Sequence, residues 1–336
     1  MNMKDSPVVS IVVPVYNGAK YLCRCLDSII HQEFEDFEIV VIDDGSTDES
    51  ERLILDYALK DSRVCYYKQE NSGVSVARNN GIIKARGVWV TFVDCDDEIL
   101  PGFLSELLVH EKRYDLLVSG YQESYVECKI DYSITEQGVG LSVQEYLSLN
   151  ISSCQVRAPW CKLFRRAWLE SNTDKFDPDL TLGEDTIFNL EYLFRTPRIF
   201  QSPYIGYVWF RDHETSLTSR ATPEQWVKFI ERYLKILEQL LFYGIVSSAV
   251  ICGDVFKKLR YVFFGLLTGP LKYKDFQRIM EAGSYLGLPR GNGRRPKITE
   301  MGLPLFVISF LGRGKICYFG VITLWTMKMM FKKLLK

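Results

Sequence analysis

The chain has few of the residues that build zinc sites and disulfide frameworks, and their spacing fits neither. Its 336 residues include three histidines and nine cysteines, and no two cysteines form a C-x-x-C pair. An odd number of cysteines without a regular pattern favours reduced thiols and a cytoplasmic setting. We therefore expect neither a cysteine-rich metal site nor a fold held together by disulfides.

Long apolar runs are also missing. Residues 1–7 lack the apolar core of a signal peptide. Near the other end, apolar runs at residues 303–311 and 316–326 are separated by a Gly-Arg-Gly-Lys stretch. Each run is shorter than the ~18–20 residues that cross a bilayer. This pattern predicts no membrane-spanning helix.

Charge is spread unevenly along the chain. The net charge is −1, but residues 285–336 hold ten Lys or Arg and one acid, so this segment carries +9 and the remainder −10. A basic tail with apolar runs predicts an interfacial anchor on the anionic inner face of the cell membrane. The alternative is a packed pair of C-terminal helices with a solvated end. We expect no nucleic-acid partner.

The first hundred residues alternate between strand and helix patterns. Short β-branched runs predict strands at residues 8–13, 37–42, 64–67 and 88–93, and apolar residues at helical spacing occupy the segments between them. Such alternation with short connections predicts an α/β fold. We expect a Rossmann-like, mainly parallel sheet flanked by helices.

Two helix starts have sequence signals. Ser46 or Thr47 is expected to cap the helix that follows the second predicted strand. Thr222-Pro223-Glu224-Gln225 combines an N-cap, a proline at the first helical position and a glutamine at the capping-box position. It predicts a helix with an apolar side running to Leu241, and a further helix is expected over residues 254–267. The chain should therefore have a helical C-terminal extension.

Two groups of acids directly follow predicted strands. Asp43 and Asp44 follow the second strand, and Asp94, Asp96 and Asp97 follow the fourth. Ligands of parallel sheets bind beyond the carboxyl ends of the strands, so both groups should open onto one crevice. Clustered carboxylates repel one another, and a divalent cation that binds nucleotide phosphates would relieve this repulsion. The alternative is an acidic surface turn.

Four motifs in this region resemble those of the family 2 inverting glycosyltransferases, in the family's order and spacing. They are Val12-Val13-Pro14-Val15-Tyr16-Asn17, Val41-Ile42-Asp43-Asp44-Gly45-Ser46-Thr47-Asp48, Gly73-Val74-Ser75-Val76-Ala77-Arg78-Asn79-Asn80-Gly81 and Phe92-Val93-Asp94-Cys95-Asp96-Asp97. Further on, Trp160-Cys161-Lys162-Leu163-Phe164 and Leu182-Gly183-Glu184-Asp185 resemble the acceptor-side motifs of bacterial polysaccharide-type members. Residues beyond 220 bring no recognisable family pattern.

The resemblance implies a GT-A fold, an NDP-sugar donor that is usually UDP-linked, a Mn2+ or Mg2+ ion, and inversion at the anomeric carbon. It also implies a role for each matched donor-side position. Pro14, Tyr16 and Asn17 hold the nucleotide base and ribose, Asp44 or Asp43 accepts a hydrogen bond from uracil, Arg78 lies near the nucleotide, Asp94 approaches the ribose and the metal, Asp96 binds the metal, and Asp97 lies next to the sugar.

On the acceptor side, the resemblance matches Glu184-Asp185 to the family's Glu-Asp pair, in which the aspartate is the usual general base. The alternative is a solvated acidic pair at the start of a helix. His213, in a late polar loop, is a candidate ligand of the metal or the diphosphate, or else a solvated loop residue. Trp160 and Lys162 are candidates for acceptor-sugar contacts, with core packing as the alternative for Trp160.

The Gln-x-x-Arg-Trp motif and the membrane spans of processive family members are missing from the sequence. The leading hypothesis is therefore a non-processive hexosyltransferase, acting in cell-surface polysaccharide synthesis on a glycan or lipid-linked saccharide. One alternative is a non-catalytic sugar- or nucleotide-binding relative. The other, a nucleotidylyltransferase, would need a Gly-rich basic loop after the first strand, where Pro14-Val15-Tyr16-Asn17-Gly18 stands.

These inferences together predict a domain plan. One glycosyltransferase domain is expected over residues 1–220, with a nucleotide-sugar half at 1–100 and an acceptor half at 101–220. A helical extension at 221–288 and the basic apolar tail at 289–336 are expected to follow.

Overall fold

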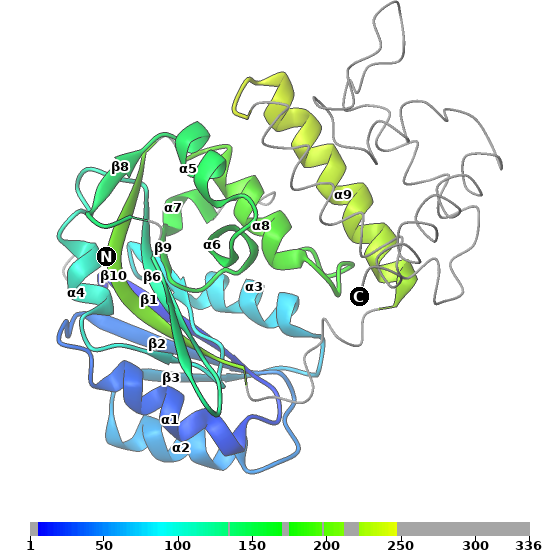
Figure 1. Ribbon diagram of the computed structural model, residues 1–336. Helices are drawn as coiled ribbons and strands as arrows, with labels where there is room; N and C mark the ends of the chain where they lie inside the picture. The colour runs from blue at the N-terminus through cyan, green and yellow to red at the C-terminus, as the bar shows by residue number, and fades with distance from the viewer. Residues whose placement is uncertain (1–5, 134, 170–174, 197, 212–221, 247–336) are drawn as a thin grey trace, which may run out of the picture. The chain divides into compact units, whose positions relative to one another are not determined.

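The computed structural model describes residues 6–133, 135–169, 175–196, 198–211 and 222–246 (Figure 1). The chain divides into two compact units, the first comprising Met1–Asp179 and Gly183–Ser216 and the second Leu180–Leu182 and Leu217–Lys336. In the first unit, the described residues form a ten-stranded sheet with the order β3-β2-β1-β4-β9-β6-β10-β5, and β7 and β8 are paired with β6 and β10.

The strands of this sheet are β1 (Val9–Val15), β2 (Phe37–Asp43), β3 (Val64–Lys68), β4 (Trp89–Phe92), β5 (Glu98–Ile99), β6 (Leu116–Ser124), β7 (Lys129–Tyr132), β8 (Val139–Leu141), β9 (Lys162–Arg165) and β10 (Ile199–Phe210). Neighbours among β1 to β4 run parallel, as do β6 and β10. Strand β9 runs antiparallel to both β4 and β6, so it joins the two parallel parts.

The helices of the first unit are α1 (Ala19–Ile30), α2 (Ser50–Lys60), α3 (Val74–Lys84), α4 (Phe103–Leu108), α5 (Val143–Asn150), α6 (Cys154–Arg157), α7 (Arg166–Leu169) and α8 (Glu184–Leu193). Helices α1 and α2 cover one face of the β1–β3 region, and α3 covers the other (Figure 1). The predicted α/β fold with a sheet flanked by helices is therefore confirmed. The sheet is parallel over β1 to β4, as predicted, and mixed beyond them, because β5, β7, β8 and β9 pair antiparallel with their neighbours.

The core forms where the sheet is covered on both faces. Every residue of β1 and β2 is buried, as continuous apolar runs in parallel strands require. Helix α3 approaches this sheet closely at Gly81, where an added Cβ would lie 2.2 Å from Cγ1 of Val12. A larger residue at that position would push α3, and with it Arg78, away from the sheet.

The predicted strands agree with β1 to β4, but one predicted helix cap was wrong. Helix α2 begins at Ser50 after Glu49, which makes no side-chain cap. Ser46 and Thr47 instead hydrogen-bond to Asn17 across the neighbouring loop. Turn residues favour both uses, and the local sequence does not distinguish them.

In the second unit, α9 (Pro223–Phe242) begins as predicted. The Thr222 side chain accepts from the Gln225 amide, and the Gln225 side chain accepts from the Thr222 amide, which completes a capping box. Phe229, Tyr233 and Leu237 are buried along one side of the helix. The helix predicted at residues 254–267 and the basic tail lie outside the described residues.

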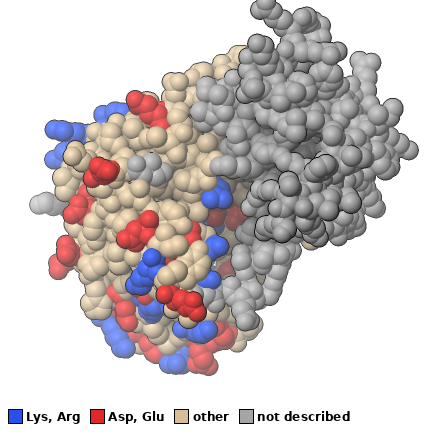
Figure 2. Space-filling model, viewed as in Figure 1, with Lys and Arg blue, Asp and Glu red and all other residues tan. Residues whose placement is uncertain are grey.

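The described part of the chain has no membrane-spanning helix, and one face of its first unit has mixed charge (Figure 2). None of its helices combines the length and the apolar character that a bilayer crossing demands. On the face shown in Figure 2, acidic and basic side chains are interspersed over the first unit. That mixture contrasts with the tail sequence, in which ten basic residues accompany one acid.

Candidate active site

Both predicted acid groups lie at one edge of the sheet. Strand β1 runs parallel to β2 and β4 and lies between them, so their carboxyl ends share that edge. The amide of Asp44 donates to the carbonyl of Val15 (2.8 Å), and the Asn17 side chain accepts from the Thr47 amide (2.8 Å). Strand order and these loop contacts therefore bring the donor-side motifs together.

The end of β1 offers two accessible residues to a ligand. Tyr16 is 53% exposed, and Asn17 is exposed with φ 51°, a left-handed conformation that asparagine tolerates well. Pro14, the third predicted residue, is buried within β1 opposite Ile42. Pro14 is thus part of the core of the strand, while Tyr16 and Asn17 are accessible, and the predicted nucleotide contacts of all three stay predictions.

Asp43 and Asp44 are both buried and hold neighbouring loops. The Asp44 carboxylate accepts from Nε2 of Gln69 (2.7 Å) and from the amides of Ser72 (2.8 Å) and Gly73 (2.9 Å). Asp43 accepts from the Ser46 amide and from the Tyr66 hydroxyl. A carboxylate has about four acceptor positions, so Asp44 retains capacity for one more donor. The predicted uracil contact stays a prediction.

The loop after β4, residues 93–97, is here called the acidic loop, and its three aspartates lie in two different environments. Asp94 and Asp96 are partly exposed, whereas Asp97 is 1% exposed. Asp97 accepts from the Tyr207 hydroxyl (2.6 Å) and from the Phe210 amide (2.9 Å). Burial, followed by the charges of Asp96 and Asp94, raises the pKa of Asp97 well above its ordinary value. In this arrangement Asp97 anchors the loop to β10, and its predicted sugar contact stays a prediction.

Tyr207 was not predicted from the sequence as a site residue. Besides donating to Asp97, its hydroxyl oxygen accepts from the Asp94 amide at 3.3 Å. A tyrosine within an aromatic strand gives no sequence signal of an acidic partner 110 positions away. Tyr207 therefore positions the acidic loop in a way that only the fold reveals.

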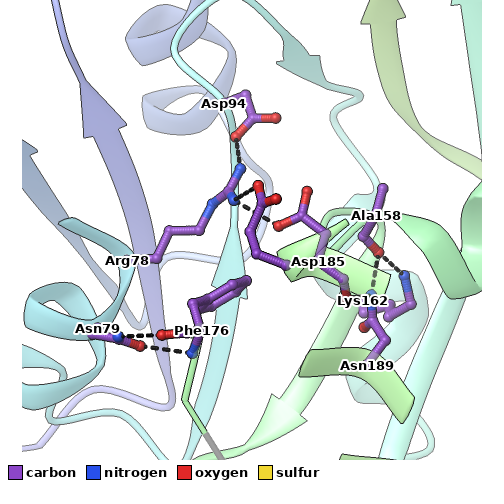
Figure 3. A network of polar contacts seen from close by, with 9 residues as sticks. Arg78, Asn79, Asp94, Ala158, Lys162, Phe176, Asp185 and Asn189 are labelled. Atoms are coloured by element: carbon purple, nitrogen blue, oxygen red, sulfur yellow. Dashed lines mark hydrogen bonds and ion pairs between the residues drawn. The ribbon is translucent and has the colours of Figure 1, made fainter. Parts of the chain in front are cut away.

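Arg78 of α3 lies between the acidic loop and the start of α8 (Figure 3). One terminal nitrogen donates to Oδ1 of Asp94 at 2.8 Å and the other to Oδ1 of Asp185 at 2.7 Å. Oε1 of Glu184 lies 3.9 Å away, and the arginine side chain is 4% exposed. One buried guanidinium thus serves three carboxylates. The partners of the guanidinium here are Asp94, Asp185 and Glu184. The predicted contact of Arg78 with the nucleotide stays a prediction.

Glu184 and Asp185 occupy the first turn of α8. Gly183 precedes them with φ 74°, a left-handed conformation that lets the chain turn into the helix. Carboxylates are favoured there by the positive end of the helix dipole. The Asp185 side chain is 23% exposed, and burial raises its pKa well above the ordinary value, against the opposing effect of Arg78. Asp185 is thus a partly accessible carboxylate paired with Arg78, and its predicted role as general base stays a prediction.

A buried network supports the base of α8. Lys162 is 1% exposed, and its Nζ donates to the carbonyls of Ala158 (2.6 Å) and Trp160 (3.1 Å). Asn189 donates to the Ala158 carbonyl and to the Asp185 carbonyl, each at 2.9 Å (Figure 3). Burial lowers the pKa of Lys162. Lys162 thus stabilises the loop before β9. Its ammonium group is buried, although the sequence predicted that it contacts the acceptor sugar.

Trp160 packs inside the same loop. It is 4% exposed, and its ring stacks on that of Tyr207 with 4.7 Å between centroids and 6° between planes. Trp160 is therefore packed in the core in this structure, as the alternative reading of this residue predicted.

Asn189 was not among the residues predicted from the sequence, because an asparagine inside a helix gives no sign of its partner.

A divalent cation fits part of the acidic loop. Among the described residues, no three or more His, Cys, Asp or Glu gather closely enough to form a complete protein site. Mg2+ and Mn2+ prefer oxygen ligands, and Mg2+ is commonly held by one or two carboxylates together with substrate phosphates and water. Asp94 and Asp96 supply two partly exposed carboxylates of this kind. His213 lies outside the described residues.

Comparison with curated proteins finds several named glycosyltransferases. EpsJ of Bacillus subtilis (strain 168), an uncharacterized glycosyltransferase, is 32% identical over 222 residues, which are 63% of each chain. Glycosyltransferase GlyA of Streptococcus pneumoniae serotype 4 is 34% identical over 230 residues, 65% of this chain and 32% of GlyA. Glycosyltransferase GlyG of the same organism is 27% identical over 293 residues, 82% of this chain and 90% of GlyG. The chain thus spans less than two thirds of the length of EpsJ and GlyA.

A solved structure shares the fold. Staphylococcus aureus TarS, residues 1–349 in complex with UDP-GlcNAc, aligns with a TM-score of 0.67 and 23% identity over 82% of this chain and 80% of that chain. At this identity the likeness concerns the fold alone. Residues 10–172 of the chain match the family described as Glycosyl transferase family 2. That match includes the strand ends and Arg78, which build the acidic edge of the sheet. Residues 10–172 therefore form a glycosyl transferase family 2 domain, and the chain has a GT-A fold.

Proposed function

We propose that the protein transfers one sugar from an NDP-sugar, with UDP as the favoured nucleotide, to a hydroxyl of a glycan or lipid-linked saccharide. Transfer proceeds by single displacement with inversion, in the synthesis of a cell-surface polysaccharide. Names of relatives such as GlyA and EpsJ support the reaction class. The shared fold with TarS, solved with UDP-GlcNAc and with UDP, supports the donor class.

One observation carries the proposal. The guanidinium of Arg78 hydrogen-bonds to Asp94 on the loop after β4 and to Asp185 at the start of α8. A donor-side acid and a proton-accepting acid are therefore separated by little more than one guanidinium group and two hydrogen bonds. An in-line displacement needs this proximity, because leaving group and attacking hydroxyl meet at one carbon.

Each step of the displacement has a residue suited to it. Asp185 accepts the proton of the acceptor hydroxyl as the new glycosidic bond forms. Glu184, beside it, adds negative charge that strengthens its basicity. A divalent cation on Asp94 and Asp96 would neutralise the charge that develops on the diphosphate leaving group. Tyr16, Asn17 and Asp44 would hold the nucleotide at the strand ends.

A donor screen with an Asp96→Ala variant tests this function. Incubation of the full chain with UDP-, GDP- and dTDP-sugars and Mn2+ or Mg2+ should release nucleoside diphosphate from one donor class, and EDTA should abolish the release. Asp96→Ala should lower the rate about 10²-fold or more, since it removes a ligand of the charge-neutralising ion. Asp56→Ala, an exposed acid paired with Arg52, is the control and should behave as wild type.

The products also separate the alternatives. A nucleotidylyltransferase would consume sugar phosphate and nucleoside triphosphate and release pyrophosphate. A non-catalytic relative would bind a nucleotide sugar without turnover. Wild-type hydrolysis rates in Asp96→Ala, or rates insensitive to EDTA, would contradict the proposed role of the acidic loop.

We further propose the domain plan and the membrane association that the sequence predicted. Residues 1–220 would carry the transfer reaction, 221–288 a helical extension, and 289–336 the anchor to an anionic membrane surface at the cytoplasmic face. Liposomes with anionic lipids should co-sediment the full chain, and a chain ending at residue 299 should remain in the supernatant, because it loses most of the apolar and basic residues. Equal sedimentation of the two chains would contradict the anchor.

A further inference from the structure

Two rows of paired side chains share one face of the sheet beside the acidic loop. The rows are Tyr207–Tyr121–Tyr132 and Trp209–Glu123–Ile130, each running across β10, β6 and β7. Side chains of directly paired residues project to the same face, and so do residues two apart in a strand. The six side chains therefore form one surface, here called the aromatic platform.

The aromatic platform has a packed interior and exposed edges. The Tyr121 ring stacks on Tyr132 with 4.8 Å between centroids, and the Trp160 ring lies 4.7 Å from Tyr207 and 5.6 Å from Trp209. Tyr121 and Tyr207 are buried, whereas Tyr132 is 36% exposed and Trp209 is half-buried. Tyr132 and Trp209 thus contact buried rings and remain partly accessible to solvent.

Charged planar groups accompany these rings. The guanidinium carbon of Arg211 lies 4.2 Å from the centroid of the Trp209 ring. Glu123 is partly exposed in the same row as Trp209, and its carboxylate accepts from the Tyr125 hydroxyl. A pyranose ring has C–H groups that pack on aromatic faces and hydroxyls that bond to carboxylate or guanidinium groups. The alternation of rings and charges fits a saccharide better than an apolar protein or lipid surface.

The aromatic platform is continuous with the candidate active site. The Tyr207 hydroxyl donates to Asp97 on the acidic loop. Trp160 stacks on Tyr207 and lies in the loop whose Ala158 carbonyl is held by Asn189 of α8, one turn after Asp185. An acceptor that places one hydroxyl at Asp185 must place its remaining sugars on the neighbouring surface. The aromatic platform adjoins both the acidic loop and the start of α8.

We propose that Trp209, Tyr132 and Glu123 form an acceptor subsite that binds pyranose rings of an oligosaccharide beyond the reacting sugar. Trp209 and Tyr132 supply the accessible aromatic surface, and Glu123 accepts hydrogen bonds from sugar hydroxyls. This subsite rests on the proposed glycosyl transfer and adds that the acceptor is an oligosaccharide of several units. Trp209 and Tyr132 are not among the donor-side residues, so the main effect of replacing them should be on acceptor affinity.

Glycan binding and donor hydrolysis together test the subsite. The probe is a printed array of bacterial capsular and cell-wall saccharides of one to six units, applied with UDP and Mn2+ present. The wild-type full chain should retain oligosaccharides at least about tenfold more tightly than the matching monosaccharides. Trp209→Ala/Tyr132→Ala should lose about tenfold or more of that affinity, as truncation of aromatic contact residues does elsewhere. Donor hydrolysis should stay within about twofold of wild type.

Controls keep the outcome interpretable. Trp209→Phe/Tyr132→Phe retains rings and should restore most of the binding, which a variant with a damaged fold would not do. Tyr67→Ala, on β3 at the opposite end of the sheet order, should bind as wild type. Equal affinity of the double alanine variant, no glycan bound by the wild type, or a changed oligomeric state on substitution would each overturn the proposal. Glycan binding without any donor hydrolysis would instead sink the proposed function.

Discussion

Asp185→Asn should lower the rate of sugar transfer by about 10²–10⁴-fold, the usual contribution of a positioned general base. Asparagine keeps the size of the side chain and a carbonyl that can accept from Arg78, so the first turn of α8 should persist. The amide cannot take the proton of the acceptor hydroxyl. Steady-state transfer with the donor found by the screen measures the loss, and calorimetric titration with UDP should show unchanged nucleotide affinity.

The pH dependence of the wild type offers a second measurement of the same group. A base acts in its ionised form, so kcat/KM should fall as the pH drops through the pKa of Asp185. Burial raises that pKa well above its ordinary value, so the fall should begin at a higher pH than an exposed aspartate would give. Asp179→Asn, an exposed acid six positions earlier, is the control. Full activity of Asp185→Asn with loss in Glu184→Gln would transfer the base role to Glu184.

Arg78→Met should cost about 3 kcal/mol in the free energy of unfolding and abolish transfer. Methionine fills similar space but leaves Asp94, Glu184 and Asp185 close together without their shared cation. Breaking a buried ion pair by removing one partner typically costs 3–5 kcal/mol, and partial exposure of the acids places the expected value near the lower end. Urea unfolding followed by circular dichroism measures the difference.

Matched variants show whether the effect belongs to this cluster. Arg52 also contacts two acids, Glu49 and Asp56, but its side chain is 61% exposed. Arg52→Met should therefore change stability by only about 0.5 kcal/mol. Adding Asp185→Asn to Arg78→Met should restore part of the lost stability, because it removes one uncompensated charge. Strict additivity of the two substitutions would contradict a direct charge interaction between them.

The positions of the acid groups could be predicted from sequence because strand direction determines them. Parallel strands joined by helices have their carboxyl ends at one edge, so Asp44 and Asp94 had to lie at the same edge once the strands were recognised. The capping box at Thr222 was equally local, since it depends on residues three positions apart. Patterns of this kind need no knowledge of distant partners.

The environment of each acid could not be predicted in the same way. Asp96 and Asp97 are neighbours of identical type, yet Asp97 is buried against Tyr207 while Asp96 is partly exposed. Likewise Lys162 looked available for an acceptor, but β9 runs antiparallel beside β4 and β6 and buries it. Burial depends on which strands become neighbours, and that follows from the packing of the whole chain.

The sequence by itself determined the α/β alternation, the family and the set of acids at the strand ends, because each is written in short-range periodicity or contiguous motifs. Only the tertiary structure decided which acids pair with Arg78, which of them anchor the loop to β10, and that an aromatic platform adjoins them. Those contacts join residues 107 positions apart in the case of Arg78 and Asp185, and 113 positions apart in the case of Asp97 and Phe210. Contacts over such separations form only when strands and helices pack, so no local pattern encodes them.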